Sequence, residues 1–334
     1  MGRKLLADPD LPAKLAAGRR DDVRPCIYQY RCIGNIFLGR AVACVANPAT
    51  GDCDQPDLAP ASRPRRVLVV GAGPAGLEVA RLAARRGHQV VLADQGPRLG
   101  GTLRTAGHTD DVLDQFLGWL IHRVDAEGVD LALSTTVDPQ LTQALGVSDV
   151  VVATGGTWVV PPIPGATADR VTTVAELAGW LESDDGSRPG PVTVLGGGKA
   201  ALSIAAVCAR RGHPVTVLEA SDVFAPQIGP PGRFRLVHET EQLGVRLVGS
   251  ATVVGVTGDA VQWRGADGEH HDAPAATVIS TLLEPGGPGT TSLVAGLGRG
   301  RAGGPAVHVV GDARAAGGIE GALADARRVA TLLD

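Results

Sequence analysis

The sequence predicts an α/β protein with two dinucleotide-binding units that follow a cysteine-rich segment. A strand, a glycine turn, a helix and a second strand occur in this order at Gly71 and again 125 residues later at Gly196. Four of the five cysteines precede the first copy. With 334 residues, of which 44% are apolar, the chain is long enough for two domains of ordinary size.

The first copy has the residues that phosphate binding requires. Arg66–Val70 predicts a strand, Gly71-Ala-Gly73-Pro-Ala-Gly76 the turn, an alanine-rich stretch through Arg86 the helix, and His88–Asp94 the second strand. The first glycine makes the tight turn, the second admits a pyrophosphate, and the third lets helix and strand pack closely. The helix N-terminus attracts phosphate, and Asp94 would accept hydrogen bonds from an adenosine ribose.

The second copy repeats this order with one substitution. Pro191–Leu195 and Pro214–Glu219 predict the strands, and Gly196-Gly-Gly198-Lys-Ala-Ala201 the turn that opens the helix Ala201–Arg211. Ala201 replaces the third glycine and is small enough for close packing. Glu219 would bind the second ribose and, by its charge, favours NADH, whereas Arg210 and Arg211 leave NADPH open. A degenerate copy that binds nothing is the alternative.

Two later segments extend the first unit. Asp149–Thr154 predicts a buried strand that ends in Ala153-Thr-Gly155-Gly156, a turn that a ligand could approach closely. Ala306–Val310 predicts another strand, which Gly311-Asp312 and a helix from about Gly318 to Leu333 follow. Asp312 is placed to bind a polyol such as ribitol. Further predictions are helices at 111–126, 174–181 and 232–243, strands at 245–248 and 276–281, and a hairpin at 251–263.

From Pro64 to Asp334 the chain resembles the two-domain flavoproteins of the glutathione-reductase type, on the motifs above and Leu99-Gly-Gly101. The resemblance implies two Rossmann-like domains, the second inserted in the first. FAD would bind to residues 61–160 plus 290–334, NAD(P)H would bind to residues 161–289, and residues 1–60 would form an N-terminal helix and cluster segment. The residues expected to contact these cofactors are Gly71, Gly73, Ala75, Gly76, Asp94, Gly101, Thr154, Gly155, Gly196, Gly198, Ala201, Glu219, Gly311 and Asp312.

The N-terminal segment resembles a narrower group, which comprises 2,4-dienoyl-CoA reductase, trimethylamine dehydrogenase and N-methylproline demethylase. The similarity lies in Gly2-Arg3, Arg24-Pro-Cys26 and Asn47-Pro-Ala-Thr-Gly51. These enzymes carry an FMN-bearing TIM barrel before the junction, and the resemblance implies that Arg3 reaches the FMN phosphate. The barrel would then be a separate subunit that binds the small-molecule substrate, unless the chain is a fragment of a longer one.

The cysteines match most of this group's iron–sulfur pattern, which is C-x2-C-x2-3-C-x11-12-C. Cys26, Cys32 and Cys44 take the first, third and fourth places, and Gln29 takes the second. Because four thiolates are the usual ligands, four outcomes stay open. These are a cluster with a non-cysteine fourth ligand, a three-iron cluster, ligation by Cys53, or an empty site.

Other residues suggest no catalytic group of their own, since cofactors carry the chemistry in such proteins. Cys208 is expected in the core, His270 and His271 in a solvated turn, and residues 4–17 in one helix with an exposed apolar stripe. A net charge of −4 without blocks of like charge gives no support to nucleic-acid or membrane binding. The charged N-terminus lacks a signal sequence, so a cytoplasmic location is expected.

Three functions are compatible with these residues. The first is an electron-transfer subunit that links NAD(P)H, FAD, an iron–sulfur cluster and FMN on a TIM-barrel partner. Within it, the compact Cys-x5-Cys spacing slightly favours amine oxidation or N-demethylation over enoyl reduction, without deciding the direction of electron flow. The second is a non-redox scaffold that keeps ADP in place of FAD. The third is a stand-alone NAD(P)H:acceptor reductase.

Overall fold

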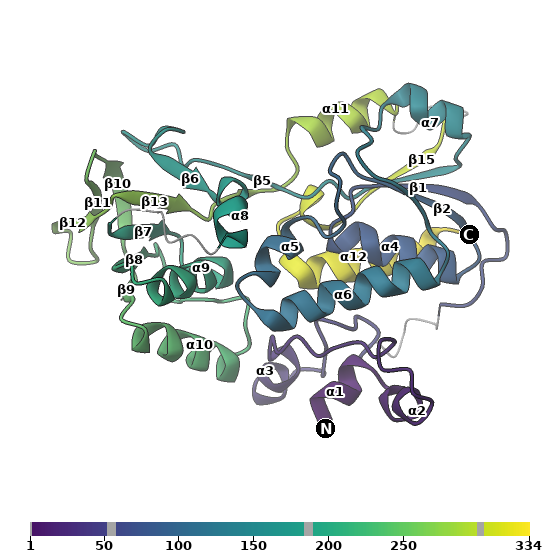
Figure 1. The fold of residues 1–334 in the computed structure, drawn as a ribbon, viewed down its shortest axis with the longest axis horizontal. Coiled ribbons are helices and arrows are strands. Elements are labelled where there is room, and N and C mark those ends of the chain that lie inside the picture. The colour runs from purple at the N-terminus through teal and green to yellow at the C-terminus, as the bar shows by residue number, and fades with distance from the viewer. Residues whose placement is uncertain (1, 52–57, 184–189, 299–303) are drawn as a thin grey trace.

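The computed structural model describes residues 2–51, 58–183, 190–298 and 304–334. Two parallel five-stranded sheets lie in separate lobes, and three short N-terminal helices lie together beside α6 (Figure 1). The α/β class and the two parallel sheets predicted from the sequence are confirmed. The domain boundaries at 60, 160 and 289 stay a prediction.

The first sheet has the order β15-β4-β1-β2-β3, and all its strands are parallel. Val67 and Val69 of β1 face a core formed with α4, α6 and α12, whereas Leu68 and Val70 face α7 and α11. The strands are β1 (Arg66–Val70), β2 (Gln89–Ala93), β3 (Asp130–Ala132), β4 (Asp149–Val152) and β15 (Ala306–Val309). The helices around them are α4 (Pro74–Arg85), α5 (Thr102–Gly107), α6 (Asp111–Ala126), α7 (Pro139–Leu145), α11 (Pro288–Gly296) and α12 (Gly318–Leu332), with the 3-10 turn η1 (Gly311–Ala313).

The second sheet has the order β6-β13-β7-β8-β9. Helices cover the face to which Val192 and Val194 point, and an antiparallel three-stranded sheet covers the face of Leu195. The strands are β6 (Val171–Thr173), β7 (Val192–Leu195), β8 (Val215–Leu218), β9 (Arg246–Val248) and β13 (Thr277–Ser280), and the antiparallel sheet has β10 (Thr252–Val256), β11 (Ala260–Arg264) and β12 (His270–Pro274). The helices are α8 (Val174–Glu182), α9 (Lys199–Arg210) and α10 (Pro230–Gln242), and the pair β5 (Thr157–Trp158) and β14 (Leu283–Glu284) joins the lobes.

The structure corrects two local predictions. The helix expected over residues 4–17 is two helices, α1 (Gly2–Ala7) and α2 (Leu11–Ala16), because proline at position 9 disfavours a helical residue before it. Of its expected apolar stripe, Leu5 and Leu15 are exposed and Leu11 is buried. The turn expected at His270 and His271 is the start of β12, although both imidazoles are exposed as expected. Cys208 is fully buried, as predicted.

Candidate cofactor sites

The first glycine turn connects β1 to α4, and two of its three glycines, Gly71 and Gly76, have no room for a side chain. A Cβ atom at Gly76 would lie 1.8 Å from the carbonyl oxygen of Gly71. Gly71 has φ +105°, and a Cβ there would lie 2.4 Å from the Ala153 carbonyl oxygen. At Gly73, by contrast, no described atom lies within 4 Å of a Cβ position. The N-terminus of α4 therefore has open space in front of it, as a bound pyrophosphate requires.

Asp94 is fixed at the end of β2 by the turn that it faces. Its Oδ2 accepts a hydrogen bond from Ala72 N at 2.6 Å, and its Oδ1 accepts one from Gly96 N at 2.7 Å. A carboxylate has acceptor sites for further donors beyond these two. The geometry thus leaves room for the predicted ribose contacts, which stay a prediction.

The other residues predicted for the FAD site gather around the same turn. A Cβ at Gly101 would lie 3.1 Å from Gly73 Cα, and one at Gly311 would lie 2.9 Å from Ala75 Cβ. Thr154 Oγ1 lies 2.7 Å from Thr290 Oγ1. Segments that are far apart in the sequence therefore meet at one edge of the first sheet.

Asp312 binds backbone groups at the start of α12. Its Oδ1 accepts hydrogen bonds from Gly317 N at 2.9 Å and Gly318 N at 3.0 Å. Sequence reasoning missed the residue that holds this loop from behind, which is Asp325. Its Oδ2 accepts from Gly311 N at 3.0 Å and from Arg314 Nε at 2.9 Å.

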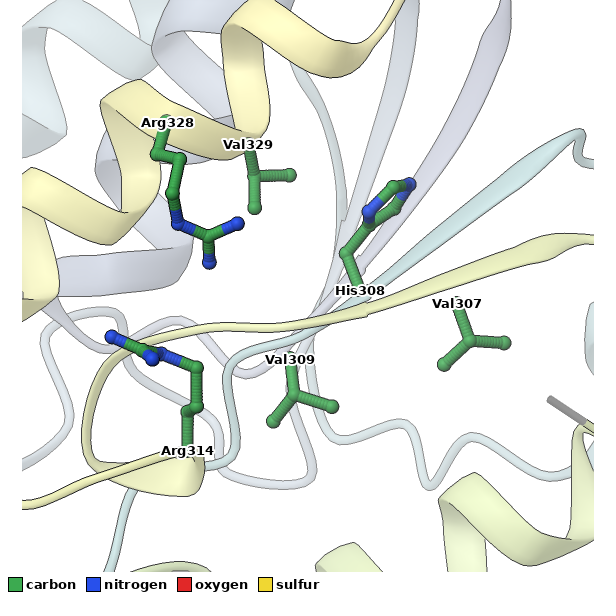
Figure 2. Close-up of a pocket in the computed structure, with 6 residues that line it drawn as sticks. All are labelled: Val307, His308, Val309, Arg314, Arg328 and Val329. Atoms are coloured by element: carbon green, nitrogen blue, oxygen red, sulfur yellow. The ribbon is translucent and has the colours of Figure 1, made fainter.

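A pocket of about 420 Å³ lies behind this loop, between β15 and α12. Figure 2 shows Arg314 and Arg328 on one side of it and His308, from β15, on the other. Both guanidinium groups contact the Asp325 carboxylate. The arginines therefore serve to hold Asp325, and through it the Gly311 loop. The remaining lining residues are Val307, Val309 and Val329.

The second glycine turn connects β7 to α9 as the first connects β1 to α4, but side chains of the loop after β8 cover it. Glu219 Oε2 accepts from Gly197 N at 2.5 Å, which matches the contact that Asp94 makes in the first copy. A Cβ at Gly197 would lie 2.8 Å from the Phe224 ring, and one at Gly198 would lie 3.2 Å from Gln227 Nε2. The loop after β8 thus lies over the turn. Ala201 is fully buried, in agreement with its proposed packing role.

The side chain of Arg211 is bound by groups that lie away from this turn. Its guanidinium stacks 4.2 Å from the Trp180 ring centre and donates to three backbone carbonyls, of which Ser183 O is at 2.8 Å. Arg210 ends α9, and the glycine turn lies at the other end of this helix. Neither arginine is therefore positioned to meet a ribose 2′-phosphate.

The N-terminal residues 2–51, called the cysteine segment below, lie against the first domain, and Cys26 and Cys44 are in contact with its core. Burial raises the pKa of the Cys44 thiol, and the nearby Cys26 and Cys32 add to the rise, against backbone hydrogen bonds from Asn47 and Ala46. The three thiols thus lie within electrostatic range of one another. Such N–H groups also stabilise cluster sulfurs.

These thiols do not yet form a ligand set. In the described part of the chain, no three His, Cys, Asp or Glu side chains are arranged as a metal site. Cys53 lies outside the described residues. The donor chemistry fits a cluster, but the thiols would have to draw together around it. The assignment of Cys26, Cys32 and Cys44 stays a prediction.

The loop between Cys26 and Cys32 has an unusual backbone. Tyr28 and Tyr30 have φ values of 50° and 56°, in the left-handed region that residues with a side chain seldom adopt. The Arg3 guanidinium lies 5.1 Å and 4.6 Å from the centres of these two rings. Its Nη1 is buried, and no described residue hydrogen-bonds it.

Arg24 connects the cysteine segment to the core. Its Nη1 donates to Ala46 O at 3.0 Å and to Asn47 Oδ1 at 3.1 Å, and its Nη2 lies 3.7 Å from Glu78 Oε1. Burial lowers the pKa of Arg24 to about 10, against the attraction of Glu78. The guanidinium therefore stays charged at neutral pH and fixes the loop whose N–H groups face Cys44.

Two glycine turns, each between a strand and a helix of a parallel sheet, define a protein with two dinucleotide-binding folds. The chain belongs to the family described as pyridine nucleotide-disulphide oxidoreductase, which residues 65–282 match. The resemblance to the dienoyl-CoA reductase, trimethylamine dehydrogenase and N-methylproline demethylase group is also confirmed.

Three known proteins resemble this chain over most of its length but over half or less of their own. An NADH oxidase of Thermoanaerobacter brockii is 31% identical over 290 residues, which are 84% of this chain and 44% of that protein. A probable N-methylproline demethylase of Rhizobium meliloti is 29% identical over 68% of this chain and 34% of its own length. A 2-naphthoyl-CoA reductase structure matches 98% of this chain and 49% of its own with a TM-score of 0.87 at 26% identity. The chain therefore spans half or less of these proteins.

None of the helices in the described ranges is long and apolar enough to cross a membrane.

Proposed function

We propose that the protein is an electron-transfer unit that links NADH, FAD, an iron–sulfur cluster and FMN on a TIM-barrel partner. The observation that carries this proposal is the convergence of Gly71–Gly76, Thr154 and Gly311-Asp312 at one open turn, with the cysteine segment packed on the same domain. FAD supplies the step between two-electron and one-electron transfer. The chain would bind, orient and shield the cofactors.

NADH is the proposed nucleotide on electrostatic grounds. Glu219 presents a carboxylate at the end of β8, where a 2′-phosphate would meet like charge. Arg211, which could have offset that charge, is held by Trp180 and backbone carbonyls. We expect kcat/KM for NADH to exceed that for NADPH by about tenfold or more, as the loss of a charge-assisted contact implies.

The cysteine segment offers the surface that such a partner would cover. Ile36, Phe37 and Leu38, at the end of α3 (Arg31–Phe37), are 57%, 74% and 57% exposed. Exposed apolar patches commonly mark protein interfaces. Arg3, with its buried and unpaired Nη1, lies in the same segment, and the family resemblance implies that it binds the FMN phosphate of the barrel.

The cysteine spacing and the relatives indicate the substrate class of the barrel. The Cys26 to Cys32 spacing resembles that of the amine-oxidising members of the group, and the relatives include a probable N-methylproline demethylase and a dimethylamine dehydrogenase. We therefore favour a barrel substrate that is an amine, oxidised or N-demethylated, over an enoyl thioester. Electrons from the amine would then pass through this chain to NAD⁺, and the same transfers would run in reverse when NADH is supplied.

Cofactor analysis tests the proposal. Denaturation of the purified protein should release about one FAD per chain, in agreement with one open turn of this type. Anaerobic preparations should contain iron and acid-labile sulfide. Release of ADP alone would contradict the proposal and favour a scaffold. Full turnover of NADH with its physiological acceptor by the single chain would instead favour a stand-alone reductase.

Serine substitutions test the cluster ligands. Cys26→Ser, Cys32→Ser or Cys44→Ser should each abolish bound iron and sulfide, because a hydroxyl replaces a thiolate ligand poorly. Cys208→Ser is the matched control, since this buried residue lies in the other domain. If Cys53→Ser has the same effect as the three, Cys53 is the fourth ligand. Iron that persists in all the variants would refute the assignment.

A further inference from the structure

The two glycine turns differ in what lies in front of them. The N-terminus of α4 is open at Gly73, whereas Gln227 and Phe224 cover the N-terminus of α9. Gln227 Oε1 accepts a hydrogen bond from Lys199 N at 3.3 Å, so this side chain occupies one of the donors that a pyrophosphate would use. A nucleotide that enters the second site must displace it.

Lys199, the first residue of α9, is the cation closest in sequence to this turn. Its Nζ lies 3.2 Å from Asp110 Oδ2. Asp110 belongs to the other lobe, where its Oδ1 caps α6 by accepting from Val112 N at 3.1 Å. Burial lowers the pKa of Lys199, while Asp110 opposes the shift. The ion pair thus joins the two lobes at the entrance to the covered turn.

We propose that Lys199 is a binding residue for the pyrophosphate of the pyridine nucleotide and that Asp110 competes with the nucleotide for it. This inference rests on the proposed binding of NADH to the second domain. A pyrophosphate at the α9 N-terminus carries more negative charge than one carboxylate and gains the helix N–H groups as well. Nucleotide binding would release Lys199 from Asp110 and so loosen one link between the lobes.

Substitutions that remove the charge of Lys199 or of Asp110 distinguish a role in pyrophosphate binding from a purely structural ion pair. Asp110→Asn keeps a side-chain oxygen for the α6 cap, because asparagine caps as well as aspartate does. It should tighten nucleotide binding about threefold, the effect of removing one partly exposed ion pair. Lys199→Gln should weaken binding about tenfold through the loss of a charge-assisted contact. The double variant should match Lys199→Gln alone, since Asp110 acts only through Lys199.

Calorimetric titration of the FAD-loaded protein with ADP-ribose is the measurement. ADP-ribose carries the pyrophosphate but no nicotinamide, so no electron transfer disturbs the result. Glu182→Gln is the matched control, because Glu182 forms another ion pair between the lobes, with Arg98 at 3.2 Å. This variant should bind ADP-ribose as the wild type does.

The direction of the two effects decides the result. Opposite changes for Asp110→Asn and Lys199→Gln support the inference. Changes in the same direction, or no change for Lys199→Gln, would overturn it and leave the ion pair a structural link only. A wild-type protein that holds FAD but binds neither ADP-ribose nor NADH would instead refute the proposed nucleotide role, and the inference with it.

Discussion

The side chains of Asp94 and Glu219 bind the backbone of the two glycine turns. Each carboxylate accepts a backbone N–H from its turn, from Ala72 and Gly197 respectively. Each acid therefore holds its glycine turn in place, and its contacts with a ribose stay a prediction. The sequence could identify both acids because a βαβ unit fixes their distance from the turn. It could not identify Asp325 or Gln227, since tertiary packing alone brings them to the sites.

Asp94→Ala should weaken FAD binding about tenfold to a hundredfold, because charge-assisted hydrogen bonds contribute roughly 1.5–3 kcal/mol. Part of the loss would come from the turn, which loses its link to Ala72 N. FAD dissociation constants from flavin fluorescence provide the measurement. Asp130→Ala, at an exposed end of β3, is the control. Unchanged FAD binding in Asp94→Ala would show that the acid does not face the cofactor.

At the scale of elements, the sequence predicted the repeat well because strand, turn and helix are local. β1 and α6 begin and end at the predicted residues. The short elements α3, α5 and α11 were not predicted, since tertiary contacts hold them more than their own periodicity does. Residues 4–17 resembled one amphipathic helix, and proline at position 9 divided it.

The buried His88, between α4 and β2, leads to a prediction of how the stability of the fold depends on pH. His88, buried before β2, accepts from Arg65 N at Nδ1 and lies 3.0 Å from Leu333 O at Nε2, which suits the neutral ring. Burial lowers the pKa of His88, so the unfolded chain binds the proton more readily. Stability should therefore be fully present above the unfolded pKa, about 6.5, and decrease as the pH falls below it.

Urea unfolding at pH 7.5 and pH 5.5, about one unit to either side of that value, measures this effect. The wild type should lose stability at the lower pH. His88→Gln, which keeps an acceptor and a donor but cannot gain a proton there, should lose less. An equal loss in both proteins would assign the pH dependence to other groups.

For the whole molecule, the cysteine segment is the part that the sequence described least completely. Its motif identified the three cysteines, but the contact of this segment with the second lobe was not predicted. Gly229 N donates to Gln29 O at 2.9 Å, and a Cβ at Gly232 would lie 2.2 Å from the Tyr30 ring. The segment therefore contacts both lobes.

Phe37→Glu should abolish binding of the barrel partner and leave the isolated chain folded. Phe37 is 74% exposed, so a charge there should change the free energy of unfolding little while disfavouring burial in an interface. Co-purification with the barrel subunit and thermal unfolding of the single chain are the two measurements. Leu131→Glu, at an exposed position of β3, is the control. A complex that survives Phe37→Glu would place the interface elsewhere.

The most direct test of electron transfer through this chain is anaerobic rapid mixing of the purified protein with NADH. Visible absorption would follow the flavin, and electron paramagnetic resonance of frozen samples would follow the cluster. The account predicts that the flavin is reduced first and that the signal of a reduced iron–sulfur cluster then appears. Bound ADP without flavin, or a flavin that NADH reduces without any later cluster signal, would contradict it.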